Sequence, residues 1–384
     1  MFKVNPEIIK DIKKYGALEI TSCFNCGTCT AICPLSKEDS AFPRKLIRYA
    51  NLGMKDKLLA SKEMWMCYYC GECSKTCPRE AKPAAFMAAA RRYAIAKADI
   101  TGLTGLLYKW PVLNFLIMTI VAFLLGMFMY GQRVEHRDGH KIIEVFNIPF
   151  SFIHDLGLGV ILVAVFVFFV GGLITFFRSL EGKVIVASFL KKDKKGITLK
   201  AVKEAFKIVV DEMLVFKRFK ECDAEAQSGN KFLLPSFLHS CTAWGFMGLF
   251  GATILDFLFK DPQLLVSLWY PPRLLGTISG IFLIYGTTGI IIKRLLKNEV
   301  PYSNSTFSDW WFILVLWFIG VTGFILEVLV YLPKGSISQK SADVLFVIHV
   351  APAMELVVMA AFTKLAHVVY RPLALFSYNL KNKI

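Results

Sequence analysis

Two runs of cysteine carry the most specific chemistry in this chain of 384 residues. Each run has the form CxxCxxCxxxCP. The cysteines are Cys23, Cys26, Cys29 and Cys33 in the first run and Cys67, Cys70, Cys73 and Cys77 in the second. This spacing is typical of thiolates that bind [4Fe–4S] clusters, and its duplication predicts two clusters.

The longer gap before the fourth cysteine sets it apart from the other three. In two-cluster domains the fourth cysteine of each run completes the other cluster. The predicted ligands are Cys23, Cys26, Cys29 and Cys77 for the first cluster, and Cys67, Cys70, Cys73 and Cys33 for the second. Zinc is the competing interpretation. A zinc site takes four ligands, usually as two CxxC pairs, whereas these two runs supply eight cysteines in a different grouping. Cys222 and Cys241 stand alone and are interpreted as small apolar residues.

Composition predicts a membrane protein. The chain is 55% hydrophobic with a mean hydropathy of +0.51, which is too apolar for a soluble protein of this length. Its net charge of +16 is attributed to the Lys and Arg that accumulate in cytoplasmic loops rather than to binding of nucleic acid. Six apolar stretches are expected to span a bilayer: 111–130, 151–177, 236–258, 272–292, 308–331 and 342–370.

Loop charges predict the orientation of these spans. The link over 178–235 is strongly basic, with Lys191, Lys192, Lys194 and Lys195 among its residues, and is expected on the inside. The chain is thus predicted to be a multi-pass protein of the cytoplasmic membrane with both termini in the cytoplasm. The apolar residues from Val202 to Phe216 recur at steps of four and three, which indicates an amphipathic helix. This helix could lie on the inner membrane surface or pack under the cluster domain. We prefer the second placement, because an inner haem must lie close to a cluster.

Four histidines lie in the predicted spans: His154, His239, His349 and His367. His349 and His367 are 18 residues apart, so one helix over 342–370 would place both rings on one face, about 27 Å apart. Depth then pairs His154 with His349 near the outer surface, and His239 with His367 near the inner surface. Two bis-histidine sites predict two b haems. The alternative is that these are polar residues satisfied by neighbouring helices.

A quinone site beside a haem requires a proton carrier. The candidates are Asp155, next to His154, and Glu355, between the two histidines of the last span, with Lys364 and Glu327 as further possibilities. Each could instead be an interhelix hydrogen-bond partner. By analogy alone, the outer site is preferred. Gly245, Gly248 and Gly251 recur every third residue and would leave room for a macrocycle or for close helix packing.

The segments over 44–60 and 80–98 are rich in helix-forming residues. The head, residues 1–108, therefore resembles the α-helical ferredoxin domains found in the C subunits of heterodisulfide reductases. The stretch LPSFLHSCTAWGFMGLFG over 234–251 looks like the E subunit of membrane heterodisulfide reductase. A fusion of the two resembles the QmoC family, the membrane subunits of quinone-interacting membrane-bound oxidoreductases. The expected fold is all-α, with a two-cluster ferredoxin domain followed over 109–384 by a six-helix dihaem cytochrome b bundle.

The resemblance implies electron transfer between menaquinone in the membrane and a cytoplasmic flavoprotein/iron–sulfur partner. The implied partners are QmoA- and QmoB-like flavoproteins, similar to the A subunit of heterodisulfide reductase, and adenylylsulfate reductase, in sulfate respiration. The chain contains no Cys-Cys pair, so we expect it to be an oxidoreductase subunit that relays electrons without itself breaking a disulfide. Two alternatives are a heterodisulfide- or sulfite-reductase-linked complex and a haem-free membrane anchor for a two-cluster ferredoxin.

Overall fold

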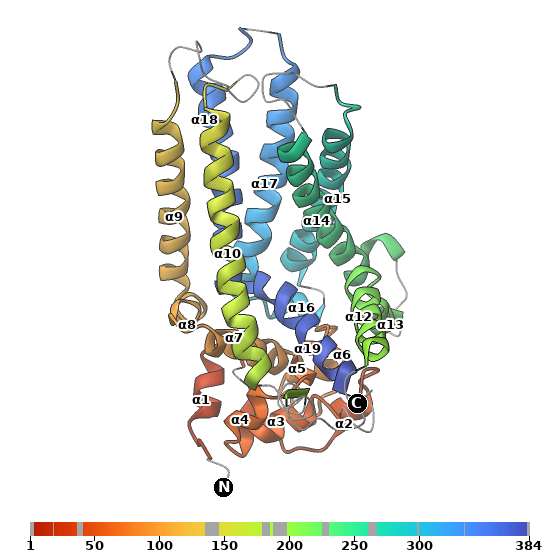
Figure 1. The fold of residues 1–384 in the computed structure, drawn as a ribbon. Coiled ribbons are helices and arrows are strands. Elements are labelled where there is room, and N and C mark those ends of the chain that lie inside the picture. The colour runs from red at the N-terminus through yellow and green to blue at the C-terminus, as the bar shows by residue number, and fades with distance from the viewer. Residues whose placement is uncertain are drawn as a thin grey trace.

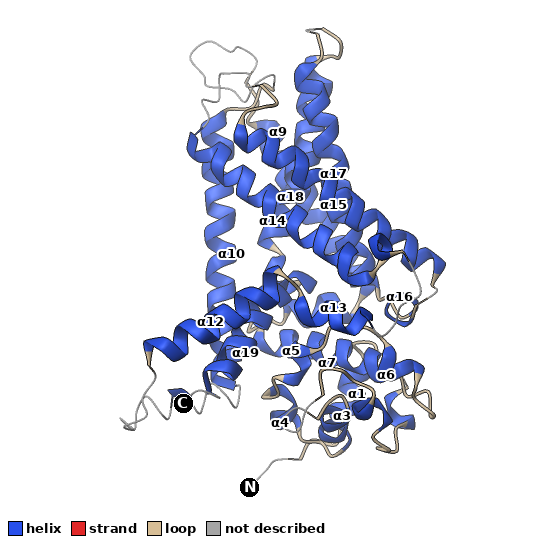
Figure 2. Cartoon of the chain, turned by 90° about the vertical axis from the view of Figure 1, so that its right-hand side faces the viewer, coloured by secondary structure: helices blue, strands red, loops and turns tan. Residues whose placement is uncertain are grey.

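Helices are the main elements of the structure, which is a computed structural model. It describes residues 4–17, 19–36, 41–134, 146–178, 185–186, 198–224, 230–259, 267–297, 299–333 and 335–381. All regular elements within these ranges are α- or 3-10 helices, and none is a strand (Figure 2). The predicted all-α fold is confirmed.

Short helices form the head, which lies at one end of a long helical bundle (Figure 1). Its elements are α1 (Ile8–Lys13), η1 (Ile20–Ser22), α2 (Thr28–Ala31), α3 (Arg44–Asn51), α4 (Lys55–Leu59), α5 (Glu63–Met66), α6 (Glu72–Lys75) and α7 (Pro83–Ala98). The single helix expected over 44–60 is divided into α3 and α4, because Gly53 adopts a φ of 71° between them. The helix expected over 80–98 is α7.

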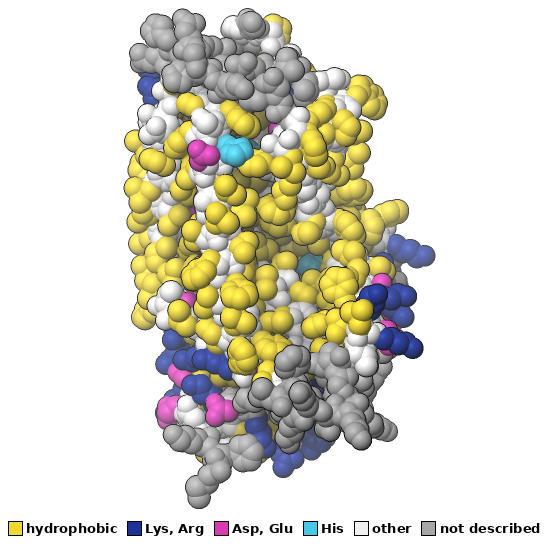
Figure 3. Space-filling model, viewed as in Figure 1, with side chains coloured by type: hydrophobic (Ala, Val, Ile, Leu, Met, Phe, Trp, Pro, Cys, Tyr) yellow, Lys and Arg dark blue, Asp and Glu magenta, His cyan; other side chains and the backbone are white. Residues whose placement is uncertain are grey.

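The bundle contains six helices long and apolar enough to cross a membrane. After α8 (Leu103–Lys109), they are α9 (Pro111–Gly131), α10 (Phe150–Arg178), α14 (Pro235–Phe259), α15 (Pro271–Leu296), α17 (Phe307–Tyr331) and α18 (Gln339–Val358). The first five agree with the predicted spans to within four residues. Apolar side chains cover the bundle, and Lys and Arg gather around the head (Figure 3).

The predicted sixth span is wrong at its C-terminal end. Helix α18 stops at Val358, and two 3-10 turns follow, η3 (Ala360–Phe362) and η4 (Lys364–Ala366), before α19 (His367–Lys381). His349 and His367 therefore belong to different helices, and the argument from one continuous helical face fails. Helix α19 leaves the bundle and runs along the head, where it packs against α5 and α12 (Figure 1).

The basic link between the second and third spans also packs on the head. Its amphipathic helix is α12 (Leu199–Leu214), followed by α13 (Lys217–Ala224). Val209 of α12, with Phe216, Phe219 and Cys222, belongs to the same apolar core as the helices of the head. The expected packing against the cluster domain is confirmed, whereas Lys191, Lys192, Lys194 and Lys195 lie outside the described residues. Residues 225–229 also lie outside them, and the short η2 (Lys231–Leu233) and α16 (Val300–Ser303) complete the elements.

Candidate functional site

The two cysteine runs fold into the same local structure. Gly27 and Gly71 occupy equivalent positions, with φ values of 99° and 93°, and each caps the short helix that follows it, α2 or α6. Such φ values favour glycine, because a Cβ atom is strained there. The turn places the third cysteine of each run, Cys29 or Cys73, inside the head.

Backbone amides also point at the sulfurs in both runs. The amide of Asn25 donates to Sγ of Cys23 at 3.4 Å, and the amide of Tyr69 donates to Sγ of Cys67 at 3.3 Å. Asn25 and Tyr69 share a left-handed backbone, with φ of 61° and 63°. A hydrogen bond to a thiolate stabilises its charge, and in iron–sulfur proteins such bonds help to set the reduction potential.

The first group of thiols gathers around Cys29. Burial raises the pKa of Cys29 to about 11, and the neighbouring charges of Cys23, Cys26 and Cys77 add to the rise. Cys26 is exposed, and a hydrogen bond from Thr28 lowers the pKa of its thiol. Cys77, from the second run, thus lies beside the first three cysteines of the first run.

The second group surrounds a cavity of about 390 Å³. Its wall includes Cys33, Cys67, Cys70 and Cys73. Burial raises the pKa of Cys33 to about 12, and the charges of Cys67 and Cys70 raise it further. Cys33 of the first run thus lines one cavity with the first three cysteines of the second run. The assignment of the eight cysteines to two clusters stays a prediction.

Each cysteine of a [4Fe–4S] cluster binds a different iron, so the sulfurs need not converge on one point. Among the described residues, no group of three His, Cys, Asp or Glu side chains is arranged to hold a single metal ion. The thiols therefore fit a cubane in their grouping, in their burial and in the amide donors that face them.

A fifth thiol, Cys222 of α13, lines the second cavity. It is 2% exposed and forms a side-chain hydrogen bond with Cys70, which together with burial raises its pKa. The sequence indicated only a small apolar residue here. No spacing signal marks Cys222, because it lies 145 residues after Cys77 and approaches the cavity only through the packing of α13.

Two arginines hold the backbone of Cys67. Arg91 of α7 donates to the carbonyl oxygen of Met64 at 2.9 Å and to that of Cys67 at 2.6 Å. Arg371 of α19 donates to the same Cys67 oxygen at 3.4 Å, and its guanidinium lies 3.7 Å from the ring centre of Tyr68. Burial raises the pKa of Cys67, whereas both arginine charges lower it.

The inner histidines lie next to this loop. His367 begins α19, and Arg371 follows one helical turn later. The ring of His239 meets Phe219 edge-on at 5.7 Å, and Phe219 stacks on Tyr68 at 4.9 Å. His367 is thus linked to the second cysteine run through Arg371 on the same helix. His239 is linked to it through Phe219, which stacks on Tyr68.

The outer histidines have separate partners. His349 of α18 bonds to the hydroxyl of Thr322 at 3.0 Å. The ring of His154 stacks on Phe257 with centroids 3.7 Å apart, and its Nδ1 lies 3.3 Å from the carboxylate of Asp155. The described contacts therefore place both His239 and His367 near the second cysteine run, and they give His154 and His349 different neighbours.

Three of the four rings have a partner at Nδ1 that can accept a hydrogen bond from the ring. The carbonyl oxygen of Lys364 accepts from His367 at 2.7 Å, and the carboxylate of Asp155 accepts from His154. Thr322 donates its own proton to Phe318 and so accepts from His349. This arrangement leaves Nε2 available, as in histidines that bind metal, so the donor set fits haem ligation.

The predicted proton carriers occupy contrasting surroundings. The side chain of Asp155 is 80% exposed, whereas Glu355 is 1% exposed and lines a cavity of about 420 Å³. Glu327 lies 3.9 Å from Arg273. Lys364 forms an ion pair with Asp309, described next.

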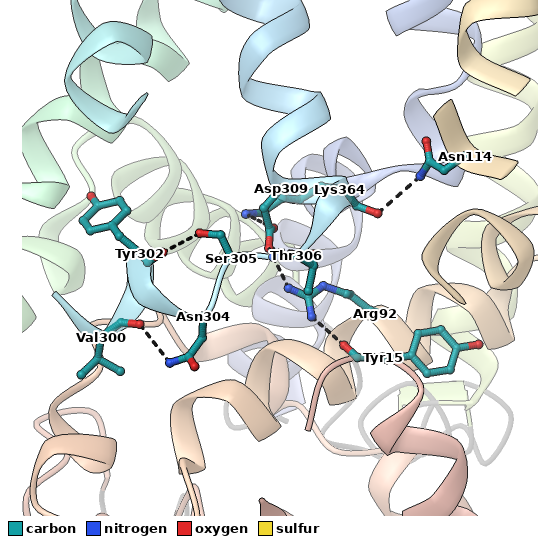
Figure 4. A network of polar contacts seen from close by, with 11 residues as sticks. Tyr15, Arg92, Asn114, Val300, Tyr302, Asn304, Ser305, Thr306, Asp309 and Lys364 are labelled. Carbon is teal, nitrogen blue, oxygen red and sulfur yellow. Dashed lines mark hydrogen bonds and ion pairs between the residues drawn. The ribbon is translucent and has the colours of Figure 1, made fainter. Parts of the chain in front are cut away.

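Asp309 connects the head to the bundle. Its carboxylate pairs with Lys364 at 2.7 Å and with Arg92 of α7 at 2.9 Å (Figure 4). Arg92 in turn donates to the carbonyl oxygen of Tyr15 at 2.6 Å. Asp309 and Arg92 are largely buried, whereas the side chain of Lys364 is 44% exposed. The network joins the segment after α1 to α7, α17 and the turn before α19.

Residues 19–81 match the 4Fe-4S dicluster domain family. The N-terminal head is a 4Fe-4S dicluster domain. It is similar to the C subunit of the "H(2):CoB-CoM heterodisulfide,ferredoxin reductase" of Methanothermobacter thermautotrophicus, at 38% identity over 62 residues, which is 16% of this chain and 34% of the relative. The iron–sulfur C subunit of the "CoB--CoM heterodisulfide reductase" of Methanopyrus kandleri is 32% identical over 70 residues, covering 16% and 36%.

A longer match extends beyond the dicluster domain. A protein of Archaeoglobus profundus, described as similar to the C subunit of heterodisulfide reductase, is 36% identical over 110 residues, covering 27% of this chain and 58% of the relative. The chain thus spans about a third of the length of the first relatives it matches. No solved structure matches it. The dicluster domain thus relates the N-terminal part of the chain to the iron–sulfur C subunits of heterodisulfide reductases.

Proposed function

We propose that this chain carries electrons between menaquinone in the membrane and a cytoplasmic flavoprotein/iron–sulfur partner. Two [4Fe–4S] clusters in the dicluster domain and two b haems in the bundle would supply one-electron redox chemistry. The proposed cluster ligands are Cys23, Cys26, Cys29 and Cys77, and Cys67, Cys70, Cys73 and Cys33. The proposed haem ligands are His239 with His367 on the head side, and His154 with His349 on the far side.

The contact between α19 and the second cysteine run carries this proposal. His367 and Arg371 lie one helical turn apart on α19, and Arg371 bonds to the backbone of Cys67. Electron transfer requires that donor and acceptor lie close together, and this contact brings an inner histidine next to a predicted cluster. A haem-free anchor would have no need of two half-buried histidines at this junction.

The partner would meet the head near the first group of thiols. Cys26 is exposed, and Phe24 and Ile32 expose apolar side chains beside it. Electrons would therefore leave or enter at this edge. The relatives are named as subunits of heterodisulfide reductases, which supports assembly with other reductase subunits. QmoA- and QmoB-like flavoproteins serving adenylylsulfate reductase are the specific partners that we propose, with both termini of this chain in the cytoplasm.

A single-turnover reduction tests this function. Purified, oxidised protein is mixed with a menaquinol analogue, and haem and cluster absorption are followed by stopped-flow spectroscopy. We expect both to become reduced. In His367→Ala the clusters should be reduced at least tenfold more slowly, because a carrier next to them is lost. Absence of any reduction of the wild-type protein by quinol would overturn the proposal.

A further inference from the structure

The polar and apolar groups around the cavity beside Glu355 suit a neutral ring that carries a polar atom at each end. It lies where α8, α9, α17 and the end of α18 meet, and it is a partly open hollow of about 420 Å³, a volume that includes space open to solvent. Four buried polar atoms on its wall have no hydrogen-bond partner: Tyr108 Oη, Asn114 Oδ1, Trp311 Nε1 and Glu355 Oε1. Leaving such an atom unpaired costs about 1–3 kcal/mol, so four around one cavity indicate a ligand that pairs with them.

The chemistry of each polar atom limits the hydrogen bonds that it can make with a ligand. Asn114 is 4% exposed, and its Nδ2 already donates to the carbonyl oxygen of Leu107 at 2.9 Å, so its Oδ1 is free to accept. Glu355 can accept as a carboxylate or donate as an acid. Tyr108 and Trp311 can each donate a proton. A ring with two oxygens could accept from the donors when oxidised and donate to the acceptors when reduced.

Charge and polarity narrow the ligand further. Apart from Glu355, the described wall contains no ionisable side chain other than Tyr108, and neither Lys nor Arg is among its residues. A phosphate or another anion would therefore meet a carboxylate with no cation on the wall to balance it. The rest of the wall is mostly apolar, with Leu107, Met118 and Val315 among its residues. A neutral head group with an apolar body is favoured.

The cavity lies just behind the lipid-facing surface. Phe115 of α9 is exposed on the bundle, and its ring meets Trp311 edge-on at 5.5 Å. An isoprenoid tail could pass here, while the ring reaches the polar atoms.

The cavity also adjoins the inner histidine. Leu356 and Phe312 of its wall pack in one apolar cluster with Leu365 and Val368, which flank His367. The outer position of Asp155, by contrast, offers an exposed carboxylate. We propose that this cavity is the quinone-head site and that Glu355 takes up the quinol proton. This inference rests on the proposed function, and it places the site on the head side rather than at the preferred outer position.

The reaction at this site balances as one quinol giving one quinone, two protons and two electrons. One proton would pass to the carboxylate of Glu355 and the other to water. The electrons would leave one at a time towards the centre held by His239 and His367. Asn114 lies 3.4 Å from Ser308 Oγ, next to Asp309, so the network of Figure 4 offers a polar route from the cavity towards the head.

The test uses a photoreactive azido-naphthoquinone on the purified full-length protein, with peptide mapping. We expect label on peptides carrying Tyr108, Asn114, Trp311 or Glu355. In Tyr108→Phe the affinity for the unlabelled analogue should fall about fivefold, as expected for one lost hydrogen bond. Tyr93→Phe is the matched control, because Tyr93 also has an unpaired buried hydroxyl but lies away from the cavity, and its affinity should not change.

Glu355→Gln separates binding from proton uptake. It keeps an acceptor oxygen, so analogue binding should stay within about twofold, whereas quinol oxidation should slow at least tenfold. Label confined to peptides around Asp155, or unchanged binding in Tyr108→Phe together with full turnover in Glu355→Gln, would overturn the site. Reduction of the centres by quinol in that same protein would leave the proposed function standing. If quinol does not reduce the centres although the azido-naphthoquinone labels the cavity, the proposed function is contradicted and the site is retained.

Discussion

At the scale of single residues, the structure adds Cys222 to the second cavity. Its thiol bonds to Cys70, a proposed ligand. A hydrogen bond to a ligand sulfur stabilises the more negative, reduced state of a cluster. With a net value of about 0.5–1 kcal/mol for the bond, Cys222→Ala should lower the reduction potential of one cluster by about 20–40 mV, since 59 mV corresponds to a tenfold change.

EPR-monitored redox titration measures this shift. Cys222→Ser keeps a donor and should retain most of the potential, and Cys241→Ala is the control, because Cys241 is buried on α14 away from the second cavity. Loss of a whole cluster signal in Cys222→Ala would show that Cys222 is itself a ligand and that the four-plus-four assignment is wrong.

The thiols should differ in reactivity when the clusters are removed. Cys26 is exposed and has a lowered pKa, so more of it is thiolate at pH 8 than of Cys33, whose pKa is raised to about 12. Thiolates are the reactive form. Brief treatment of the apo-protein with iodoacetamide, followed by mass spectrometry, should therefore modify Cys26 first. Equal rates for the two cysteines would show that the apo head does not keep this structure.

Some residues of the candidate site could be predicted from the sequence, and others could not. The spacing of the two cysteine runs names eight residues without any fold, because a loop around a cubane demands short, regular gaps. Glu355 could be named as a rare intramembrane carboxylate. Tyr108, Asn114 and Trp311 carry no such signal, since each is ordinary in a membrane helix and gains meaning only when the packing places it on a shared cavity.

At the scale of elements, hydropathy does not predict where α18 ends. The apolar run continues past Val358, so it predicts a helix to residue 370, whereas the chain turns twice before α19. Lys364 and Arg371 were the residues that could have indicated this break in the helix. Lys364 pairs with Asp309, and Arg371 bonds to the loop of Cys67. These contacts lie far apart in the sequence, so the prediction of a single helix could not use them.

Two glycines of α14 allow close packing against α15 and are not explained by space for a macrocycle. A Cβ atom on Gly245 would lie 2.5 Å from the backbone nitrogen of Leu283, and one on Gly248 would meet Ser279. Backbone cannot move aside cheaply, so Gly245→Ala should destabilise the bundle by roughly 1–3 kcal/mol. The midpoint of thermal unfolding in detergent should fall.

Gly251→Ala is the matched control for this change. Nothing lies within 4 Å of its added Cβ, and alanine favours the helix by about 1 kcal/mol, so its midpoint should stay the same or rise. Equal midpoints for Gly245→Ala and Gly251→Ala would contradict the packing of α14 on α15.

Asp309 joins several elements, and its charge should matter for stability. Asp309→Asn would leave the largely buried Arg92 without its anion, and breaking a buried ion pair typically costs about 3–5 kcal/mol. We expect a lower unfolding midpoint and faster proteolysis between head and bundle. Glu7→Gln breaks only the exposed pair with Lys10 and should cost about 0–1 kcal/mol. A similar effect of both variants would show that the network does not hold the junction.

At the scale of the whole molecule, the head and the bundle share one apolar core. Residues of α1, α3 and α7 pack with Val209 of α12, Phe216, and Tyr370 of α19. The composition predicts a border near residue 108 because apolarity changes there, but the later cytoplasmic segments return to the head. This return places the inner histidines beside the second cysteine run, and charge patterning could indicate only that these segments lie on the same side as the head.

The central claim is an unbroken series of redox centres from the far side of the bundle to the exposed edge of the head. A redox titration of the purified protein, followed by optical and EPR spectroscopy, tests it most directly. The account predicts two low-spin b haems and two [4Fe–4S] clusters, with one haem lost in His367→Ala and both clusters retained. A protein without haem absorption bands, or a His367→Ala variant with its full pigment, would contradict it.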